Sequence, residues 1–508
     1  MPTDRIPSLS KSNRTNERTS ESAFFPLAVD GRPMEQWSSR LGFLLAAIGA
    51  AVGLGNIWRF SAVVGQNGGG AYLIPYLLAA FMFALPLLIL ELAVGRSLKA
   101  DVVEAFRSVK SEYEVIGWVV SGSVVLILSY YLVLTGWVFS FMAAVLAGID
   151  LRFAGFTTTL WPLPGFVLAT VLTGWIVGSG VRTGIERLAN IVMPVIFLVL
   201  ILLAGYATTL DGFSTATAFL FTPDFSVLTD PFIWSAAFGQ VFFSLSVGQG
   251  IMLTYGSYLG DDVSIGRSAL VITVVDIAIA ILTGLVIFPI VFTFGLEPTL
   301  GTQLAFTTLP EAFAAMPFGR IVAGAFFGLL FFAALTSSVS LLEVGVAATI
   351  RKTRWSRLRT SWILTAGIFL LGIPSALSYT ALDWELAGVP ILDWMDETVG
   401  TLALPITAFL IAIVFTWVQD RETILDQLGQ AWLLPLIRYL IPAVLLVVTG
   451  LRLATQFDFP GWHLLPDFQA IGSPAQAAVM LAILAILYGI GRRLRRYHET
   501  SRTRRNRQ

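Results

Sequence analysis

The sequence predicts an all-α polytopic membrane protein with twelve transmembrane helices. Three observations predict this class: 56% of the 508 residues are hydrophobic and 13% are charged, the mean hydropathy is +0.79, and long apolar runs follow one another along the chain. This composition excludes a soluble globular protein. The chain has no cysteine and two histidines, which excludes disulfides and iron–sulfur clusters and leaves almost no ligands for a transition metal.

A hydropathy window of ~19 residues divides the chain into spans and flanking segments. The expected spans cover residues 41–65, 70–96, 115–147, 162–180, 188–207, 233–258, 265–296, 318–350, 359–378, 392–418, 433–454 and 473–491. The first 36 residues are polar and lack a long apolar core, which predicts a disordered cytoplasmic arm rather than a signal peptide. We expect five-span halves at 37–207 and 208–418, two further spans within 419–491, and a basic cytoplasmic tail at 492–508.

The placement of lysine and arginine predicts the orientation of these spans. Connections after even-numbered spans, and the C-terminal tail, are rich in both residues, whereas connections after odd-numbered spans carry mostly acids. Both termini are therefore expected in the cytoplasm, which agrees with an even number of spans. The basic tail could bind nucleic acid, but an anchor at the cytoplasmic lipid surface is the favoured interpretation.

The first span is interrupted by glycine. Residues 41–58 carry no charge, yet Gly49, Gly53 and Gly55 fall within seven positions, and glycine favours unwinding of a helix. Unwound backbone within a bilayer is tolerated only where it lines a polar cavity or binds a ligand, because bare N–H and C=O groups are costly in lipid. The segment is therefore predicted to form part of a binding site.

The sixth span has a similar interruption, five spans after the first. Its centre, residues 242–250, contains two serines, a glutamine and two glycines. Broken helices at corresponding positions of two five-span halves are typical of inverted-repeat transporters, whose site lies near the midplane of the membrane. An odd number of spans per half gives the halves opposite topologies, which is the geometry that alternating access requires.

Specific sequence blocks extend from about residue 37 to residue 418. They are WSSRLG at 37–42, GLGNIWRF at 53–60, QNGGGAY at 66–72, IPY at 74–76, Pro86, Glu91, GR at 95–96, YY at 130–131, residues 239–246, SY at 257–258 and LTSS at 335–338. On these blocks the chain resembles the neurotransmitter:sodium symporter family, which has the LeuT fold, in its prokaryotic amino-acid-carrier form. The resemblance implies sodium-coupled transport by alternating access.

The resemblance implies two sodium sites, and the residue types suit them, because sodium prefers oxygen ligands from carbonyls, hydroxyls and amides. The first site would be formed by Ala51, Asn56, Ser244 and Asp276. The second would be formed by Gly49, Val52, Ala333, Thr336 and Ser337. Each hydroxyl residue taken alone would more often pack helices or bond its own backbone. Together in these motifs, ligation is the favoured interpretation.

The expected substrate is a neutral amino acid with a hydrophobic or aromatic side chain. Amine-carrying relatives have an aspartate at the position of Gly53, so glycine there implies a substrate that brings its own carboxylate. The resemblance places the substrate among Ala51, Gly53, Gly55, Ile127, Tyr131, Phe243, Ser244, Ser246, Gln249, Ser337 and Leu341. Gln249 departs from the usual apolar residue. It could bond a polar group of the substrate or the unwound backbone, and the sequence leaves both alternatives open.

Three acids lie within expected spans. Asp276 stands where many relatives have asparagine, and a fixed carboxylate could replace the chloride that some relatives need, so we expect no chloride requirement. Glu91 resembles a glutamate that braces both unwound helices. Glu343 could form a polar bridge between helices or couple protons or cations, and both interpretations stay open.

The resemblance also implies gates. Arg59 and Asp396 would form the outer pair, steadied by Gln240, with Tyr131 and Phe243 beneath it. Trp37 and Tyr258 belong to the inner gate. The inner ion pair of relatives is missing, because its two positions hold Met34 and Arg351. A contact such as Glu35–Arg351 could replace it, and a weaker inner gate would favour the inward-open state.

The sequence as a whole predicts a sodium-coupled amino-acid symporter of the cell membrane and not an enzyme, because no nucleophile–base pair or metal cluster occurs within the spans. Two sodium ions, the amino acid and membrane lipid are the expected partners, without nucleic acid. Two alternatives remain: a proton-coupled transporter of the same fold, and a non-transporting amino-acid sensor. The amino acid and the oligomeric state are not predicted.

Overall fold

The computed structural model describes residues 35–149, 151–296, 304–386, 388–418, 428 and 430–457. The chain divides into Met1–Glu35 and Gln36–Gln508, and every described element belongs to the second unit. The first eleven helices are α1 (Arg40–Ala51), α2 (Phe60–Gln66), α3 (Leu73–Ala79), α4 (Leu85–Leu98), α5 (Val102–Val109), α6 (Glu114–Ala147), α7 (Phe153–Thr157), α8 (Pro162–Gly178), α9 (Arg187–Ala207), α10 (Phe213–Phe221) and α11 (Pro231–Ser244).

The second part of the chain continues in the same way. Its elements are α12 (Ile251–Ser257), α13 (Ile265–Thr293), α15 (Leu309–Ala315), α16 (Gly319–Thr353), α17 (Arg357–Leu377), β1 (Glu385–Leu386), β2 (Val389–Pro390), α18 (Ile391–Met395), α19 (Leu404–Ile413), α21 (Leu433–Pro435) and α22 (Ile441–Phe457). The two short strands pair antiparallel. Several helices are extended or joined by π-helical turns, at Gly55–Arg59, Ala80–Ala84, Val181–Glu186, Leu304–Thr308, Asp396–Ala403, Val414–Val418 and Leu436–Leu440.

The helices coincide with the first eleven expected spans. Within the described residues, eight continuous helices are long and apolar enough to cross a membrane, and the bent pair Arg40–Ala51 and Gly55–Gln66 makes a ninth. The fourth expected span is the shorter helix α8, and the sixth is the pair α11 and α12. The twelfth expected span, most of the N-terminal arm and the basic tail lie outside the described residues.

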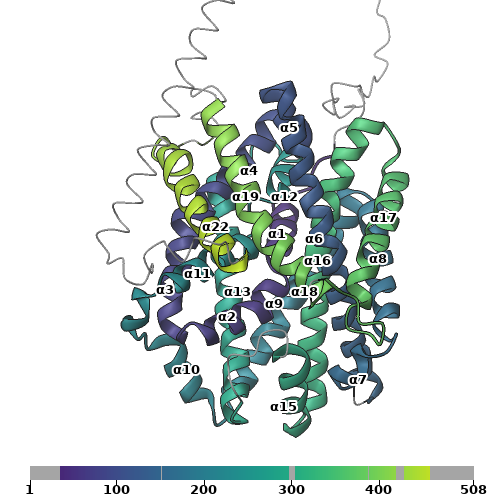
Figure 1. Cartoon of the computed structure of the whole chain (residues 1–508), viewed down its shortest axis with the longest axis vertical. Coiled ribbons are helices and arrows are strands. Elements are labelled where there is room, and N and C mark those ends of the chain that lie inside the picture. The colour runs from purple at the N-terminus through teal and green to yellow at the C-terminus, as the bar shows by residue number, and fades with distance from the viewer. Residues whose placement is uncertain are drawn as a thin grey trace, which may run out of the picture. The chain divides into compact units, whose positions relative to one another are not determined.

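The connecting helices lie at two opposite ends of the bundle. Figure 1 shows α7, α10 and α15, which follow the third, fifth and seventh spans, at one end, and α5, which follows the second span, at the other. These four connections lie at the ends that an alternating topology predicts for them.

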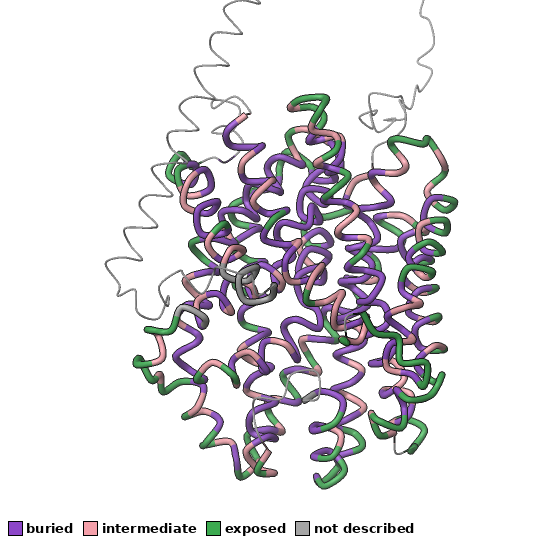
Figure 2. Tube along the Cα trace, viewed as in Figure 1, coloured by how far each residue is buried: buried purple, intermediate pink, exposed green. Residues whose placement is uncertain are grey.

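Two long helices, α6 and α16, form the centre of the bundle and pack against each other. Buried residues follow these helices and α1 through the middle of the bundle, while exposed residues lie at both ends and along the outer helices (Figure 2). Helix α8 approaches α6 at backbone distance: a Cβ atom on Gly165 would lie 2.3 Å from the carbonyl oxygen of Gly136. Small residues permit this close packing, which is common between membrane helices.

Candidate substrate and sodium site

The first span breaks where its glycines predict. Helix α1 ends at Ala51, and the helix resumes at Gly55 after a bend of 56°. Side chains satisfy the backbone groups that the break exposes. The Gly53 N–H donates to Asn56 Oδ1 at 3.1 Å, and the Leu54 N–H donates to the Tyr131 hydroxyl at 3.2 Å. Unwound backbone therefore persists here without lipid contact, as a spanning segment requires.

The sixth span is also interrupted as predicted. Helix α11 ends at Ser244 and α12 begins at Ile251. The left-handed backbone of Ser246, Gly248 and Gly250, with φ values of 52°, 86° and 71°, turns the chain between them. The Gly248 N–H donates to Glu91 Oε1 at 2.6 Å. Glycine is suited to two of these positions because it adopts positive φ without strain.

A small cavity of about 30 Å³ lies between the two breaks. It brings together every residue that the sequence assigned to the substrate, and it adds Ala50. Its lining consists of Ala50, Ala51, Gly53, Gly55, Ile127, Tyr131, Phe243, Ser244, Ser246, Gln249, Ser337 and Leu341. A lining that combines apolar walls with polar side chains is typical of small-molecule sites.

The two glycines at the cavity have no room for a side chain. A Cβ atom on Gly53 would lie 2.6 Å from Ser337 Oγ and 2.8 Å from the Tyr131 hydroxyl oxygen. A Cβ atom on Gly55 would lie 2.7 Å from Phe243 Cδ1. The backbone itself therefore forms this part of the wall, and an aspartate at position 53 would clash.

Asp276 connects the two breaks. Its Oδ1 accepts a hydrogen bond from Asn56 Nδ2 at 2.6 Å, and its Oδ2 accepts one from the Ser244 hydroxyl at 2.8 Å. Asn56, Ser244 and Asp276, three of the expected ligands of the first sodium site, are thus in contact with one another. The fourth, Ala51, lines the cavity between the breaks together with Ser244. The Asn56 amide nitrogen faces Ser244 and Asp276, whereas its oxygen accepts from Gly53. The assignment of that amide would have to reverse for Asn56 to ligate a cation here.

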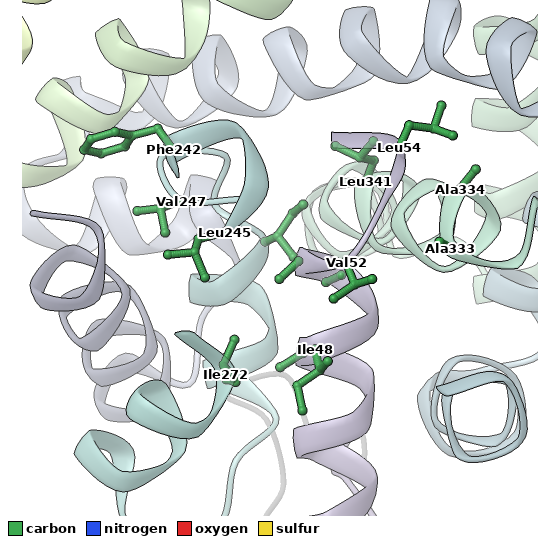
Figure 3. Packing of buried hydrophobic residues seen from close by; sticks show 14 of the residues in the cluster. Ile48, Val52, Leu54, Phe242, Leu245, Val247, Ile272, Ala333, Ala334 and Leu341 are labelled. Atoms are coloured by element: carbon green, nitrogen blue, oxygen red, sulfur yellow. The ribbon is translucent and has the colours of Figure 1, made fainter. Parts of the chain in front are cut away.

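The second expected sodium site lies where α1 meets α16. Ser337 Oγ is 3.5 Å from the Gly49 carbonyl oxygen and 3.3 Å from that of Val52. The Thr336 hydroxyl donates to the Ala333 carbonyl at 2.9 Å. In Figure 3, Ile48 on α1 and Val52 just after its end lie between Leu245 and Ile272 on one side and Ala333 and Ala334 on the other. Backbone carbonyl groups of the first span and hydroxyl groups of α16 therefore lie close together, surrounded by apolar side chains.

A family comparison decides the identity of the fold and its class of function. The model of the sodium:neurotransmitter symporter family matches residues 34–161 and 153–487. The chain belongs to the sodium:neurotransmitter symporter family. It is a sodium-dependent transporter rather than an enzyme, and the apolar helices are those of a multi-pass membrane protein.

The sequences of several relatives align with this transporter over most of their length. An uncharacterized sodium-dependent transporter of Bacillus subtilis, YhdH, is 35% identical over 435 residues, covering 81% of this chain and 96% of the relative. An uncharacterized sodium-dependent transporter of Haemophilus influenzae is 31% identical, and the match covers 83% of this chain and 99% of that relative. The crystal structure of MhsT in complex with L-phenylalanine superposes with a TM-score of 0.77 at 40% identity and covers 82% of this chain and 99% of MhsT. This likeness confirms the predicted LeuT-type fold.

The outer gate of the transporter differs from the expected contacts. The Arg59 guanidinium lies over the Phe243 ring, 4.5 Å from its centroid, and Asp396 Oδ1 accepts from the Tyr130 hydroxyl at 2.9 Å. No ion pair joins Arg59 to Asp396 in the described part of the chain. Gln240 does not steady Arg59; its Nε2 donates to the Gly55 carbonyl at 2.8 Å. The Arg59–Asp396 pair therefore stays a prediction.

The brace between the breaks also differs from the prediction. Glu91 contacts the second break, but no hydrogen bond to the first break is found among the described residues. Asp276 makes both contacts instead, because it lies on α13 between Asn56 and Ser244. The bracing role that the resemblance assigned to Glu91 is thus divided between two acids.

The expected inner-gate residues meet at the end of the bundle that bears α5. The Trp37 indole N–H donates to the Tyr255 carbonyl at 3.1 Å, and the Trp37 and Tyr258 ring centroids are 6.1 Å apart. The Tyr258 hydroxyl donates to Glu343 Oε1 at 2.5 Å, and Glu343 Oε2 pairs with Arg357 on α17. Glu343 therefore bridges α12, α16 and α17, which is one of the two interpretations left open for it.

Arg351 has a partner that the sequence did not reveal. Its Nε lies 3.2 Å from Asp101 Oδ2, and its Nη2 donates to the Lys99 carbonyl at 2.9 Å. Burial raises the pKa of Asp101, and the Arg351 guanidinium opposes that shift. Asp101 also caps α5 by accepting from the N–H groups of Val103 and Glu104. The sequence indicates that cap, with Glu104 three residues after Asp101, but not the ion pair across to α16.

Proposed function

We propose that the transporter is a sodium-coupled symporter of neutral amino acids with hydrophobic or aromatic side chains. The observation that carries this proposal is the cavity between the two breaks, whose lining contains every residue expected to contact the substrate. The substrate carboxylate would bind near Gly53 and Gly55, where backbone N–H groups and the start of a helical segment favour an anion. The complex of MhsT with L-phenylalanine supports an amino acid as the substrate class.

Two sodium ions would bind beside this cavity. The first would be held by Ala51, Asn56, Ser244 and Asp276, and the second by Gly49, Val52, Ala333, Thr336 and Ser337. The contacts of Asp276 with Asn56 and Ser244 support a fixed negative charge at the first site. A carboxylate there balances sodium without an added anion, so transport would not require chloride.

The energetics suit coupling to more than one ion. Each positive charge that moves down a potential of ~100 mV releases ~2.3 kcal/mol, so two sodium ions supply ~4.6 kcal/mol. That free energy corresponds to roughly a thousandfold accumulation of substrate before any sodium concentration gradient is counted.

The proposed setting is the cell membrane, with both termini in the cytoplasm and lipid around the bundle. The alternation of connecting helices between the two ends in Figure 1 supports this topology. Residues 37–207 and 208–418 would form the two inverted halves that move relative to each other.

A thermal-shift screen of the twenty amino acids tests the proposal. A true substrate should raise the melting temperature in sodium and have little effect in potassium, because binding of both ligands to the folded state is linked. The shift should persist when gluconate replaces chloride. Equal shifts in sodium and potassium would contradict sodium coupling, and a shift that needs chloride would contradict the role given to Asp276.

A further inference from the structure

Gln249 is the polar residue of the cavity that the family motifs do not explain. It lies in the break between α11 and α12, lines the cavity, and is 4% exposed. Around it the wall is largely apolar, with Ile127, Phe243 and Leu341. A primary amide carries two N–H donors and an oxygen acceptor, so a buried glutamine normally has several hydrogen bonds.

The other polar side chains of the cavity are all engaged within the protein. The Tyr131 hydroxyl accepts from the Leu54 N–H, Ser244 donates to Asp276, Ser246 donates to the Ala50 carbonyl at 2.9 Å, and Ser337 contacts the Val52 carbonyl. Gln249 has no hydrogen bond to any residue that the structure describes. The alternative in which its amide bonds the unwound backbone is therefore not realised.

An amide in this position discriminates between substrates. Water can satisfy it while the cavity is empty, but a substrate that fills the cavity displaces that water. An apolar side chain then leaves the amide buried without a partner, whereas a side chain with a hydrogen-bonding group replaces the lost bond. Sites with buried polar groups reject substrates that lack the matching group more strongly than apolar sites reject an added hydroxyl.

We propose that Gln249 selects amino acids whose otherwise apolar side chain carries one hydrogen-bonding group, such as the indole N–H of tryptophan or the phenol of tyrosine. This inference rests on the proposed function, because it assigns the substrate side chain to the same cavity. It narrows the hydrophobic or aromatic class to its polar-tipped members.

Competition binding in sodium with two matched pairs of ligands tests the inference. Tyrosine and phenylalanine differ by one hydroxyl, and 1-methyltryptophan differs from tryptophan by a methyl group in place of the indole N–H hydrogen. In the wild-type protein, the polar member of at least one pair should bind about tenfold or more tightly. Gln249→Met keeps a side chain of similar length without the amide, so it should make the two members of that pair bind almost equally, mainly by tighter binding of the apolar member.

Leu342→Met is the matched control, because Leu342 is buried on α16 next to Leu341 but does not line the cavity. It should preserve the preference for the polar member of the pair. Equal affinities within both pairs in the wild-type protein, or a preference that persists in Gln249→Met, would overturn the inference while leaving amino-acid symport intact. Failure of every amino acid to bind in sodium would instead contradict the proposed function, and the inference with it.

Discussion

At the scale of the residue, Gly53 determines what the cavity can hold. Ser337 and Tyr131 lie so close to Gly53 that a Cβ atom there would be nearer to both than an ordinary van der Waals contact. Gly55 is enclosed by Phe243 in the same way. Glycine is therefore needed at both positions for two reasons, the unwinding of the helix and the shape of the wall.

Gly53→Ala should weaken substrate binding. The added methyl group must displace Ser337 or Tyr131, and overpacking of this kind costs about 1–3 kcal/mol, which is roughly fivefold to more than a hundredfold in affinity. Sodium-dependent binding of a labelled amino acid measures the effect. Gly205→Ala on α9 is the control, because nothing lies within 4 Å of a Cβ atom there. Unchanged affinity in Gly53→Ala would contradict the tight wall described above.

The motifs predict the cavity lining well but not the contacts of each side chain. Their spacing fixes which residues reach the breaks, so Tyr131, Ser246 and Ser337 are found where expected. The partner of Gln240 and the orientation of the Asn56 amide depend on hydrogen bonds between distant segments. One sequence contains no direct signal for such bonds.

At the scale of the element, the two breaks are the feature that sequence predicts best. Glycines at 49, 53 and 55, and the polar run near Ser244, act through local backbone preference, so they need no knowledge of the tertiary fold. The ion pair between Arg351 and Asp101 could not be predicted in this way. Arg351 at the end of α16 meets Asp101 at the start of α5 only because the bundle packs these ends together.

Arg351→Gln should open the end of the bundle that bears α5. The Asp101 side chain is 4% exposed and the Arg351 side chain is 37% exposed, so we expect a cost of about 1–2 kcal/mol after allowance for solvent screening. That is about a fivefold to thirtyfold shift in population. Because the natural chain has no cysteine, the rate of thiol labelling at Ser257→Cys on α12 reports access to this end.

Lys352→Gln is the control for this variant. Lys352, next to Arg351 on α16, forms a more exposed pair with Glu114 on α6. Removing that pair should leave the labelling rate unchanged. The raised pKa of Asp101 adds a second check, with each labelling rate divided by that of a fully exposed cysteine at the same pH, because the thiolate is the reactive form. Acid protonates Asp101 and weakens its pair with Arg351, so the relative rate should rise, and Asp101→Asn should lose this rise. Slow labelling in Arg351→Gln at every pH would contradict a gating role for the pair.

At the scale of the whole molecule, composition and hydropathy suffice for the fold class, and family motifs suffice for the class of transporter. Eleven expected spans coincide with helices of the described chain. Ion number, chloride use and the substrate depend on a few atoms at the two breaks. Those atoms are positioned by helices far apart in the sequence, including α6, α13 and α16.

Uptake into sealed proteoliposomes tests the central claim most directly. The labelled amino acid from the thermal-shift screen should accumulate when sodium is higher outside than inside. A negative internal potential should increase uptake, because the proposed symport of two sodium ions with a substrate of no net charge would carry positive charge inward. Uptake driven by a pH gradient in sodium-free buffer would contradict sodium coupling and support the proton-coupled alternative. Sodium-dependent binding without any net uptake would support a sensor and contradict symport.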